Sequence, residues 1–236
     1  MDWLIDGMTQ AGPLEWHTGA GWLVLAGRAD WRTGETGDID AAGLAWAKPN
    51  RPTAVLLTAG ASAADGEQLL DYYGDLGGSE GYVVPVFDVT GAQDLENCLL
   101  LAQAGLIYVA DGPDVMRLIR ALRNSPALDA LLQTFEEGAC IVAVGAGAAA
   151  LSAWISATDN PHGVPGLDLL RNMLVEPAFS GSVSAGELRK LLREHSDCLG
   201  IGIPGGVALA LGPSGEVKTV GEGQITVVLN HAGEEV

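Results

Sequence analysis

The segment from Cys140 to Leu151 is the part of the sequence best suited to chemistry. It reads Cys-Ile-Val-Ala-Val-Gly-Ala-Gly-Ala-Ala-Ala-Leu, a buried strand that runs into a tight turn and then a helix of small residues. A nucleophile elbow has the pattern G-x-S-x-G, with the reactive serine at the centre of such a turn. Ala143 and Gly147 occupy the two flanking positions, and Gly145 occupies the position of the nucleophile. Glycine has no side chain that could attack a substrate, so the pattern predicts the shape of the elbow without its chemistry.

The same segment also satisfies a dinucleotide-binding fingerprint. Gly145, Gly147 and Ala150 fit G-x-G-x-x-A after a strand, and bare backbone at the start of a helix favours a pyrophosphate. The motif usually opens a domain and is followed about 20 residues later by an acidic residue at the end of a strand. Here it follows four expected strands, and residues 160–166 at that distance read as a loop. A nucleotide site is therefore the weaker interpretation.

Cysteines and serines are the other potential nucleophiles. Cys98, Cys140 and Cys198 are odd in number, far apart and flanked by apolar residues. We expect buried thiols in a reducing compartment, with no zinc site. Ser152 follows the turn, where a core hydroxyl that bonds the helix backbone is the simpler role. Three further serines are expected to cap a loop or to contact a polar ligand: Ser180, Ser182 and Ser184.

No histidine has the spacing of a metal ligand. The four are scattered along the chain, at His17, His162, His195 and His231. We expect surface or capping roles, with one alternative, in which His162 and Asp159 reach the pocket beside the elbow. Trp3, Trp16 and Trp31 fall in stretches without a regular pattern, which favours either a core position or a subunit interface.

Alternating strands and helices predict the frame that would position the elbow. Apolar runs typical of strands covered on both faces begin at Trp22, Thr53, Tyr82, Leu106 and Cys140. Pro85 in the third run indicates an edge strand or a bulge. Helices are expected over 39–46, 64–73, 92–104, 115–123, 127–137 and 147–155. This alternation predicts an α/β fold with a doubly wound, mostly parallel sheet.

Both ends of the chain depart from this alternation. Residues 1–20 are irregular, so we expect an N-terminal arm followed by a single α/β domain over 21–236. After a helix over 185–195, four short apolar segments extend from Leu199 to Leu229. The sequence Gly-Pro-Ser-Gly at 212–215 indicates a hairpin turn. We expect these strands to form an antiparallel C-terminal extension of the main sheet.

The composition limits the class of partner. The chain has 236 residues, of which 48% are hydrophobic, enough for one large domain with a full core. Twelve basic and thirty acidic residues give a net charge of −18, which repels phosphate backbones and anionic lipid headgroups. We therefore expect neither nucleic acid nor membranes as partners. Without a signal-peptide pattern or an apolar run of about 18 residues, a cytoplasmic location is the expectation.

Several segments are similar in sequence to segments of one enzyme family and occur in the same order along the chain. They are Val55–Ser62, Tyr72–Gly78, Leu106–Gly112, Gly166–Leu170, Leu199–Ile203 and Val220–Val228. Together they resemble peptidase family S51, the cyanophycinases and dipeptidase E, over most of the chain from Trp22 to Leu229. The resemblance implies a class I glutamine amidotransferase-like fold, which is a flavodoxin-like three-layer arrangement.

The residues that this resemblance would make catalytic are missing. The family's motif Gly-Thr-Ser-Ala-Gly-Ala places Gly145 at the serine position, and its motif Asp-Gln-His-Phe, read over 176–179, places Ala178 at the histidine position. Asp111 falls at the Gly-Gly pair of the oxyanion hole, where a carboxylate opposes the developing negative charge. The family's acidic segment is replaced by Pro-Gly-Gly at 204–206. Because triad members act as a unit, their joint loss implies that catalysis was lost.

The sequence thus predicts a catalytically inactive S51 homologue that acts in binding, regulation or assembly, with no cofactor and no metal. A homodimer or a complex with an active paralogue is the expected assembly. A residual pocket would comprise Asp111, Gly112, Gly145, Ala146, Glu176 and Ser180. Two alternatives remain: an active serine-type hydrolase with relocated catalytic groups, and a nucleotide-binding protein that uses the turn from Gly145 to Ala150.

Overall fold

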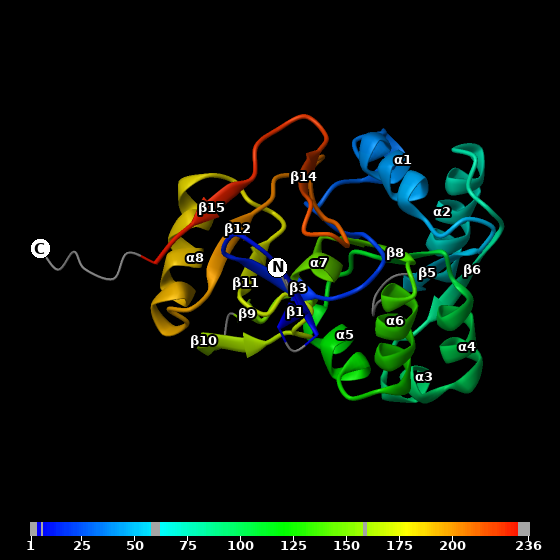
Figure 1. Ribbon diagram of the computed structural model, residues 1–236, viewed down its shortest axis with the longest axis horizontal. Helices are drawn as coiled ribbons and strands as arrows, with labels where there is room; N and C mark the ends of the chain where they lie inside the picture. Colours follow the sequence, from blue (N-terminus) through cyan, green and yellow to red (C-terminus); the bar gives the residue numbers. More distant parts are fainter. Residues whose placement is uncertain (1–3, 6, 58–61, 158–159, 231–236) are drawn as a thin grey trace, which may run out of the picture.

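A seven-stranded sheet forms the centre of the molecule in the computed structural model, which describes residues 4–5, 7–57, 62–157 and 160–230 (Figure 1). The strand order is β14-β13-β4-β8-β7-β5-β6. The strands are β4 (Leu23–Ala26), β5 (Thr53–Leu57), β6 (Gly81–Pro85), β7 (Leu106–Val109), β8 (Cys140–Val144), β13 (Ala208–Leu211) and β14 (Val217–Val220). Five neighbouring strands are parallel to one another, namely β4, β8, β7, β5 and β6. β13 pairs antiparallel with β4 and with β14, and the predicted hairpin turn joins β13 to β14. The mostly parallel sheet is confirmed, and Pro85 does lie in an edge strand.

Helices cover both faces of this sheet. They are α1 (Gly37–Trp46), α2 (Ala63–Asp75), α3 (Val89–Gln93), α4 (Leu95–Gln103), α5 (Val115–Leu122), α6 (Pro126–Glu136) and α7 (Ala146–Ala150). Successive strand residues point to opposite faces. Val55 and Leu57 of β5 share a core with Leu69 of α2, and α1 packs on the same face. Ala54 and Leu56 belong to the opposite core, which α3 to α7 cover.

Side-chain caps explain where several helices begin. The Ser62 hydroxyl accepts a hydrogen bond from the first turn of α2, and Ser125 does the same for α6, whose first residue is Pro126. Asp94 has an extended backbone and caps α4. A capping carboxylate of this kind starts a new helix, so the helix predicted over 92–104 is divided into α3 and α4.

A second, smaller sheet carries much of the C-terminal third. Its strands are β11 (Met173–Glu176), β12 (Leu199–Gly202) and β15 (Thr226–Val228), with α8 (Ser182–Glu194) between the first two. β11 and β12 are parallel, and β15 is antiparallel. The predicted C-terminal extension is therefore only half right, because β13 and β14 join the main sheet but β12 and β15 do not. The crossover through α8 pairs β12 with β11, and Leu174, Leu192 and Val228 share a separate core there.

The N-terminal segment is an antiparallel sheet, so the prediction of an irregular arm over 1–20 is wrong. Its strands are β1 (Leu4–Ile5), β2 (Met8–Ala11) and β3 (Leu14–His17). Strands of two to four residues are too short for alternation to be recognisable in the sequence. Trp16 is only 1% exposed in the main core and bridges to Leu170. It is a core residue and not an interface residue, whereas Trp3 lies outside the described residues.

The chain after the elbow helix is a hairpin and not a longer helix. β9 (Trp154–Ala157) pairs antiparallel with β10 (Asn160–Pro165). The helix predicted over 147–155 ends at Ala150 because the backbone N–H of Ala153 donates to Met173 and not to the preceding turn. The loop predicted over 160–166 is largely strand β10.

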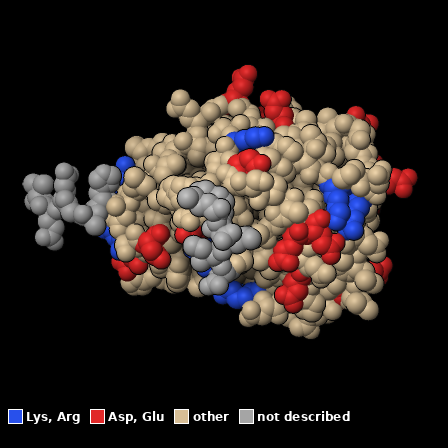
Figure 2. Space-filling model, viewed as in Figure 1, with Lys and Arg blue, Asp and Glu red and all other residues tan. Residues whose placement is uncertain are grey.

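Acidic residues outnumber basic ones in the chain, thirty to twelve. Figure 2 shows acidic side chains spread over the visible face with fewer basic ones between them, in keeping with the net charge of −18. None of the helices within the described ranges is long and apolar enough to cross a bilayer.

Candidate functional site

The turn between β8 and α7 has the sharp geometry predicted for an elbow. Gly145 has φ 55° and ψ −120°. This combination lies outside the region that residues with side chains occupy at positive φ. The N–H of Gly145 donates to the carbonyl of Ala26 in β4 at 3.1 Å, which anchors the turn to the sheet. The chain thus enters α7 through a backbone conformation that glycine adopts without steric strain.

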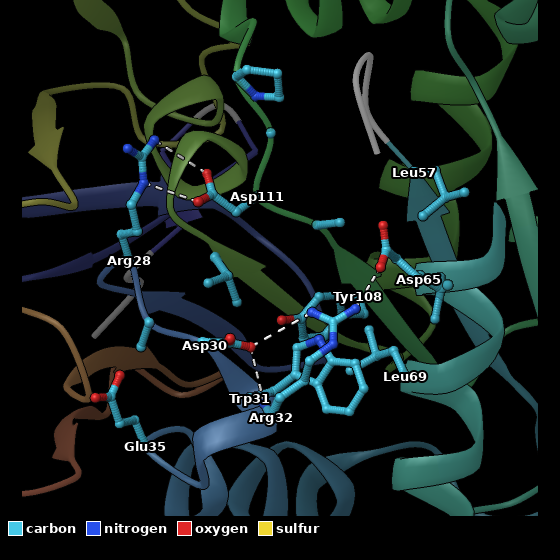
Figure 3. A pocket seen from close by; sticks show the side chains of 17 residues that line it. Arg28, Asp30, Trp31, Arg32, Glu35, Leu57, Asp65, Leu69, Tyr108 and Asp111 are labelled. Atoms are coloured by element: carbon cyan, nitrogen blue, oxygen red, sulfur yellow. Dashed lines mark hydrogen bonds and ion pairs between the residues drawn. The ribbon is translucent and has the colours of Figure 1, made fainter. Parts of the chain in front are cut away.

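Asp111, which follows β7, fills the space beside this turn. A Cβ atom built on Gly145 would lie 2.3 Å from Oδ1 of Asp111. That oxygen accepts a hydrogen bond from the backbone N–H of Ala146 at 2.7 Å. The other carboxylate oxygen pairs with Nε of Arg28 at 2.9 Å, as Figure 3 shows. The carboxylate therefore occupies the space that a side chain at position 145 would need.

The same contact disfavours a nucleotide at the turn from Gly145 to Ala150. A pyrophosphate placed there would meet the carboxylate of Asp111, which already accepts the N–H of Ala146. α7 has only five residues, all of them buried. The fingerprint is therefore a packing motif here.

Ala178 lies in the loop between β11 and α8, which contacts the segment that carries Arg28. The backbone N–H of Arg28 donates to the carbonyl of Pro177. The N–H of Ala178 donates to the Glu176 carboxylate at 3.1 Å. Arg28 thus connects the loop of Ala178 with the elbow, since its backbone N–H donates to Pro177 and its side chain pairs with Asp111.

The residues predicted for a residual pocket are divided among several places. Asp111 and Gly112 line one large cavity, whereas Glu176 lines a smaller one against α8. Ser180 belongs to a loop cap, because its N–H donates to the Ser184 hydroxyl at 3.1 Å. Gly145 and Ala146 are buried beneath Asp111. The turn at Gly145 is therefore buried, and the cavity lined by Asp111 and Gly112 lies next to it.

This cavity has a volume of about 550 Å³ and lies at the carboxyl ends of β4, β5, β7 and β8. Ligands of open α/β sheets commonly bind at this edge. Apolar side chains form its walls: Val55, Leu57, Leu69 and Val144. Tyr108 lies between them, and the segment 28–35 closes the opposite side. Sequence reasoning missed this segment, although it directly follows a buried strand, which was the available signal.

Arg32 spans the mouth of the cavity. It belongs to the short 3-10 helix η1 (Trp31–Thr33), and its guanidinium lies 4.4 Å from the centre of the Trp31 ring. It pairs with Asp30 and also with Asp65 of α2 (Figure 3). Hydrogen bonding from Ser62, assisted by Arg32, lowers the pKa of Asp65. These contacts tie η1 to α2 across the opening.

A buried carboxylate lies behind the cavity. Asp40 of α1 is fully buried and accepts hydrogen bonds from Thr36 at 2.6 Å, Tyr73 at 2.7 Å and Tyr72 at 3.1 Å. Burial raises the pKa of Asp40, although the three hydrogen bonds oppose this shift. Tyr73 packs edge-on against Tyr108, with ring centres 5.9 Å apart. Sequence reasoning missed this cluster, because no local pattern distinguishes Asp40 from a solvated helix residue.

The other candidate nucleophiles lie in structural positions. Cys140 is completely buried and burial raises the pKa of its thiol. Cys198 is also buried, but Cys98 is only partly so. The Ser152 hydroxyl is buried and accepts the N–H of Val175 at 3.0 Å. Among the described residues that line the large cavity, none is serine, threonine, cysteine or histidine.

The described histidines make surface contacts. His17 pairs with Glu136 at 2.7 Å, and His162 pairs with Glu194 of α8 at 2.9 Å. His195 stacks on a tryptophan of β9. His231 and Asp159 lie outside the described residues. Within the described ranges, no group of three acidic, histidine or cysteine side chains has the geometry of a metal site.

The chain is similar to known peptidases in sequence and in fold. The sequence profile described as Peptidase family S51 matches residues 54–216, more than half of the chain. The fold is similar to the crystal structure of a peptidase from an acI-B1 Actinobacterium, with a TM-score of 0.66 and 22% sequence identity over 94% of both chains. At 22% identity, this structural match supports a similar fold and does not by itself support a shared function. The family match includes the elbow and the loop that holds Ala178, and this chain belongs to peptidase family S51.

Proposed function

We propose that this protein is a catalytically inactive member of family S51 that binds a small ligand at the carboxyl edge of its main sheet. The observation that carries the proposal is the Asp111 carboxylate, which lies against Gly145 and accepts the N–H of Ala146. A serine peptidase needs a nucleophile, a base and free N–H donors for the oxyanion. Position 145 has no side chain, position 178 is alanine, and the N–H of Ala146 already donates to a negative charge.

The open cavity beside the elbow supports binding as the function. Its volume of about 550 Å³ is within the usual range for small-molecule sites, roughly 300–1,000 Å³. Its walls are apolar, with a few polar groups at the rim, which is the usual composition of such sites. The alternative of relocated catalytic groups finds no support in this cavity, because its described lining has no hydroxyl or thiol nucleophile apart from a tyrosine.

Activity assays on the purified protein test this proposal. We expect no turnover of aspartyl dipeptides or cyanophycin, no covalent labelling by a fluorophosphonate, and no labelling of the buried Cys140 and Cys198 by iodoacetamide in the folded state. Labelling after unfolding serves as the control for the three cysteines. The proposal would be overturned by turnover above the blank that a single substitution, such as Asp111→Asn, abolishes. The matched control is Ser152→Ala, which removes a buried hydroxyl that bonds the backbone N–H of Val175 and does not line the cavity.

A further inference from the structure

The side chain of Tyr108 lines the cavity and is almost completely buried. Its side chain is only 4% exposed, and its hydroxyl makes no hydrogen bond with any residue that the structure describes. In the same part of the chain, no completely buried side-chain nitrogen or oxygen lacks a partner. The hydroxyl must therefore open into the cavity, where Figure 3 places Tyr108 among the lining side chains. Burial raises the pKa of Tyr108, so its proton is available to a ligand.

The charges at the rim favour a cation. Four carboxylates and two guanidinium groups line the cavity: Asp30, Glu35, Asp65, Asp111, Arg28 and Arg32. Both arginines are already paired with carboxylates, whereas Glu35 makes no ion pair with any described residue. The net charge of the whole chain has the same sign as this excess. A cleft with low-dielectric walls and one dominant sign of charge concentrates ligands of the opposite sign.

We propose that the cavity binds a small organic cation with an apolar body and a hydroxyl or carbonyl group that hydrogen-bonds to Tyr108. The apolar body would lie against the walls formed by Val55, Leu57 and Val144. The ammonium group would lie near Glu35. This inference rests on the proposed function, since it names the class of ligand for the same cavity. Phosphates and carboxylates are disfavoured, because both arginines are neutralised within the protein.

Calorimetric titration with three probes of similar shape tests the inference. Tyramine has both an ammonium and a hydroxyl group, phenethylamine lacks the hydroxyl, and 3-(4-hydroxyphenyl)propionate carries the opposite charge. We expect tyramine to bind at least about tenfold more tightly than the anion, because the rim repels a carboxylate. We also expect tyramine to bind more tightly than phenethylamine. Equal or tighter binding of the anion would overturn the inference.

Two substitutions distinguish the contribution of the Tyr108 hydrogen bond to binding from that of the Glu35 charge. Tyr108→Phe should weaken tyramine binding by about three- to tenfold, the range for one net hydrogen bond, and leave phenethylamine binding unchanged. Glu35→Gln, at an exposed position, should weaken both amines. Tyr82→Phe is the matched control, since the Tyr82 hydroxyl donates to Leu100 at 2.6 Å outside the cavity. An unchanged ratio of tyramine to phenethylamine affinity in Tyr108→Phe would overturn the role of Tyr108.

The two proposals fail in different ways. Peptide turnover by the unmodified protein would contradict the proposed function, whether or not the protein binds the amines. A protein without turnover that binds none of the amines would overturn this inference and leave the absence of catalysis intact.

Discussion

Gly145 and Asp111 are in direct contact, so substitutions at the two positions are coupled. We expect Gly145→Ser to create no peptidase activity and to lower the free energy of unfolding by about 1–3 kcal/mol, through strain at positive φ. The new Cβ atom would also meet Oδ1 of Asp111 at 2.3 Å. The double variant with Asp111→Gly should lose less stability than the sum of the two single variants. Urea unfolding provides the measurement.

Gly181→Ala is the matched control for this experiment. Gly181 has φ 85° and ψ −136°, and an added Cβ would have no neighbour within 4 Å. The loss of stability in Gly181→Ala therefore measures the backbone strain alone, without a steric contact like the one with Asp111. A Gly145→Ser protein with an unchanged melting temperature would contradict the assignment of the elbow.

Asp40 makes stability depend on pH. Burial raises its pKa above the ordinary value of 3.8, so the folded chain holds this proton more readily than the unfolded chain does. The contribution of Asp40 to stability is therefore fully present below pH 3.8 and is lost as the pH rises through the folded-state pKa. We expect Asp40→Asn to become more stable relative to the unmodified protein as the pH rises over that window. Urea unfolding at a series of pH values measures the difference.

The exposed neighbour Asp38 provides the comparison for this pH dependence. Asp38→Asn removes one carboxylate from the same helix but leaves the buried cluster intact. The difference in the free energy of unfolding between Asp38→Asn and the unmodified protein should not change over the same pH range. A parallel pH dependence in both variants would assign the effect to general charge and not to Asp40.

At the scale of elements, Trp16 attaches the N-terminal sheet to the domain. Its ring is 1% exposed within the main core. We expect Trp16→Ala to lower the free energy of unfolding by about 3–5 kcal/mol, the usual effect of removing a large buried side chain. Trp31→Ala is the control, because Trp31 is half-buried at the rim of the cavity. Equal losses in chemical denaturation would show that β1 to β3 contribute little to the domain.

The packing of the elements also explains how the elbow accommodates glycine at position 145. The elbow is anchored by β8 on one side and by α7, which packs against α5 and β11, on the other. None of these contacts requires a side chain at position 145. The packing of the elbow therefore does not depend on a side chain at this position.

At the scale of the whole molecule, charge and exposed apolar residues have opposite effects on association. The net charge of −18 opposes it, whereas Leu95 and Leu99 of α4 are 72% and 51% exposed. The homodimer stays a prediction. We expect light scattering during size-exclusion chromatography to give the mass of two chains at about 0.5 M salt, where repulsion is screened, and a larger monomer fraction at low salt. The mass of one chain under both conditions would contradict it.

Three further expectations also stay predictions. They are a cytoplasmic location, the exclusion of nucleic acid and membranes as partners, and the complex with an active paralogue. The exclusion of nucleic acid and membranes depends on the net charge of −18 alone.

The sequence by itself determined the features that depend on local pattern. Short apolar runs predicted β4 to β8, and the segments between these runs predicted most of the helices, because these signals are local in the sequence. The elbow itself was also predictable from the sequence, since Gly145 and its flanking small residues lie in one short segment. The strands of the N-terminal sheet escaped notice because they are too short for their alternation to be distinctive.

Only the tertiary structure decided what surrounds the elbow. Residues 28, 111 and 145 are far apart in the chain, and their contact depends on the order of β4, β8 and β7 in the sheet. The cavity combines a loop after β4 with the first turns of α2, and the separate sheet of β11, β12 and β15 depends on the crossover through α8. Such pairings arise from packing between distant segments. Local spacing therefore predicted the elbow and its glycine, whereas only the fold showed that the carboxylate of Asp111 lies against Gly145.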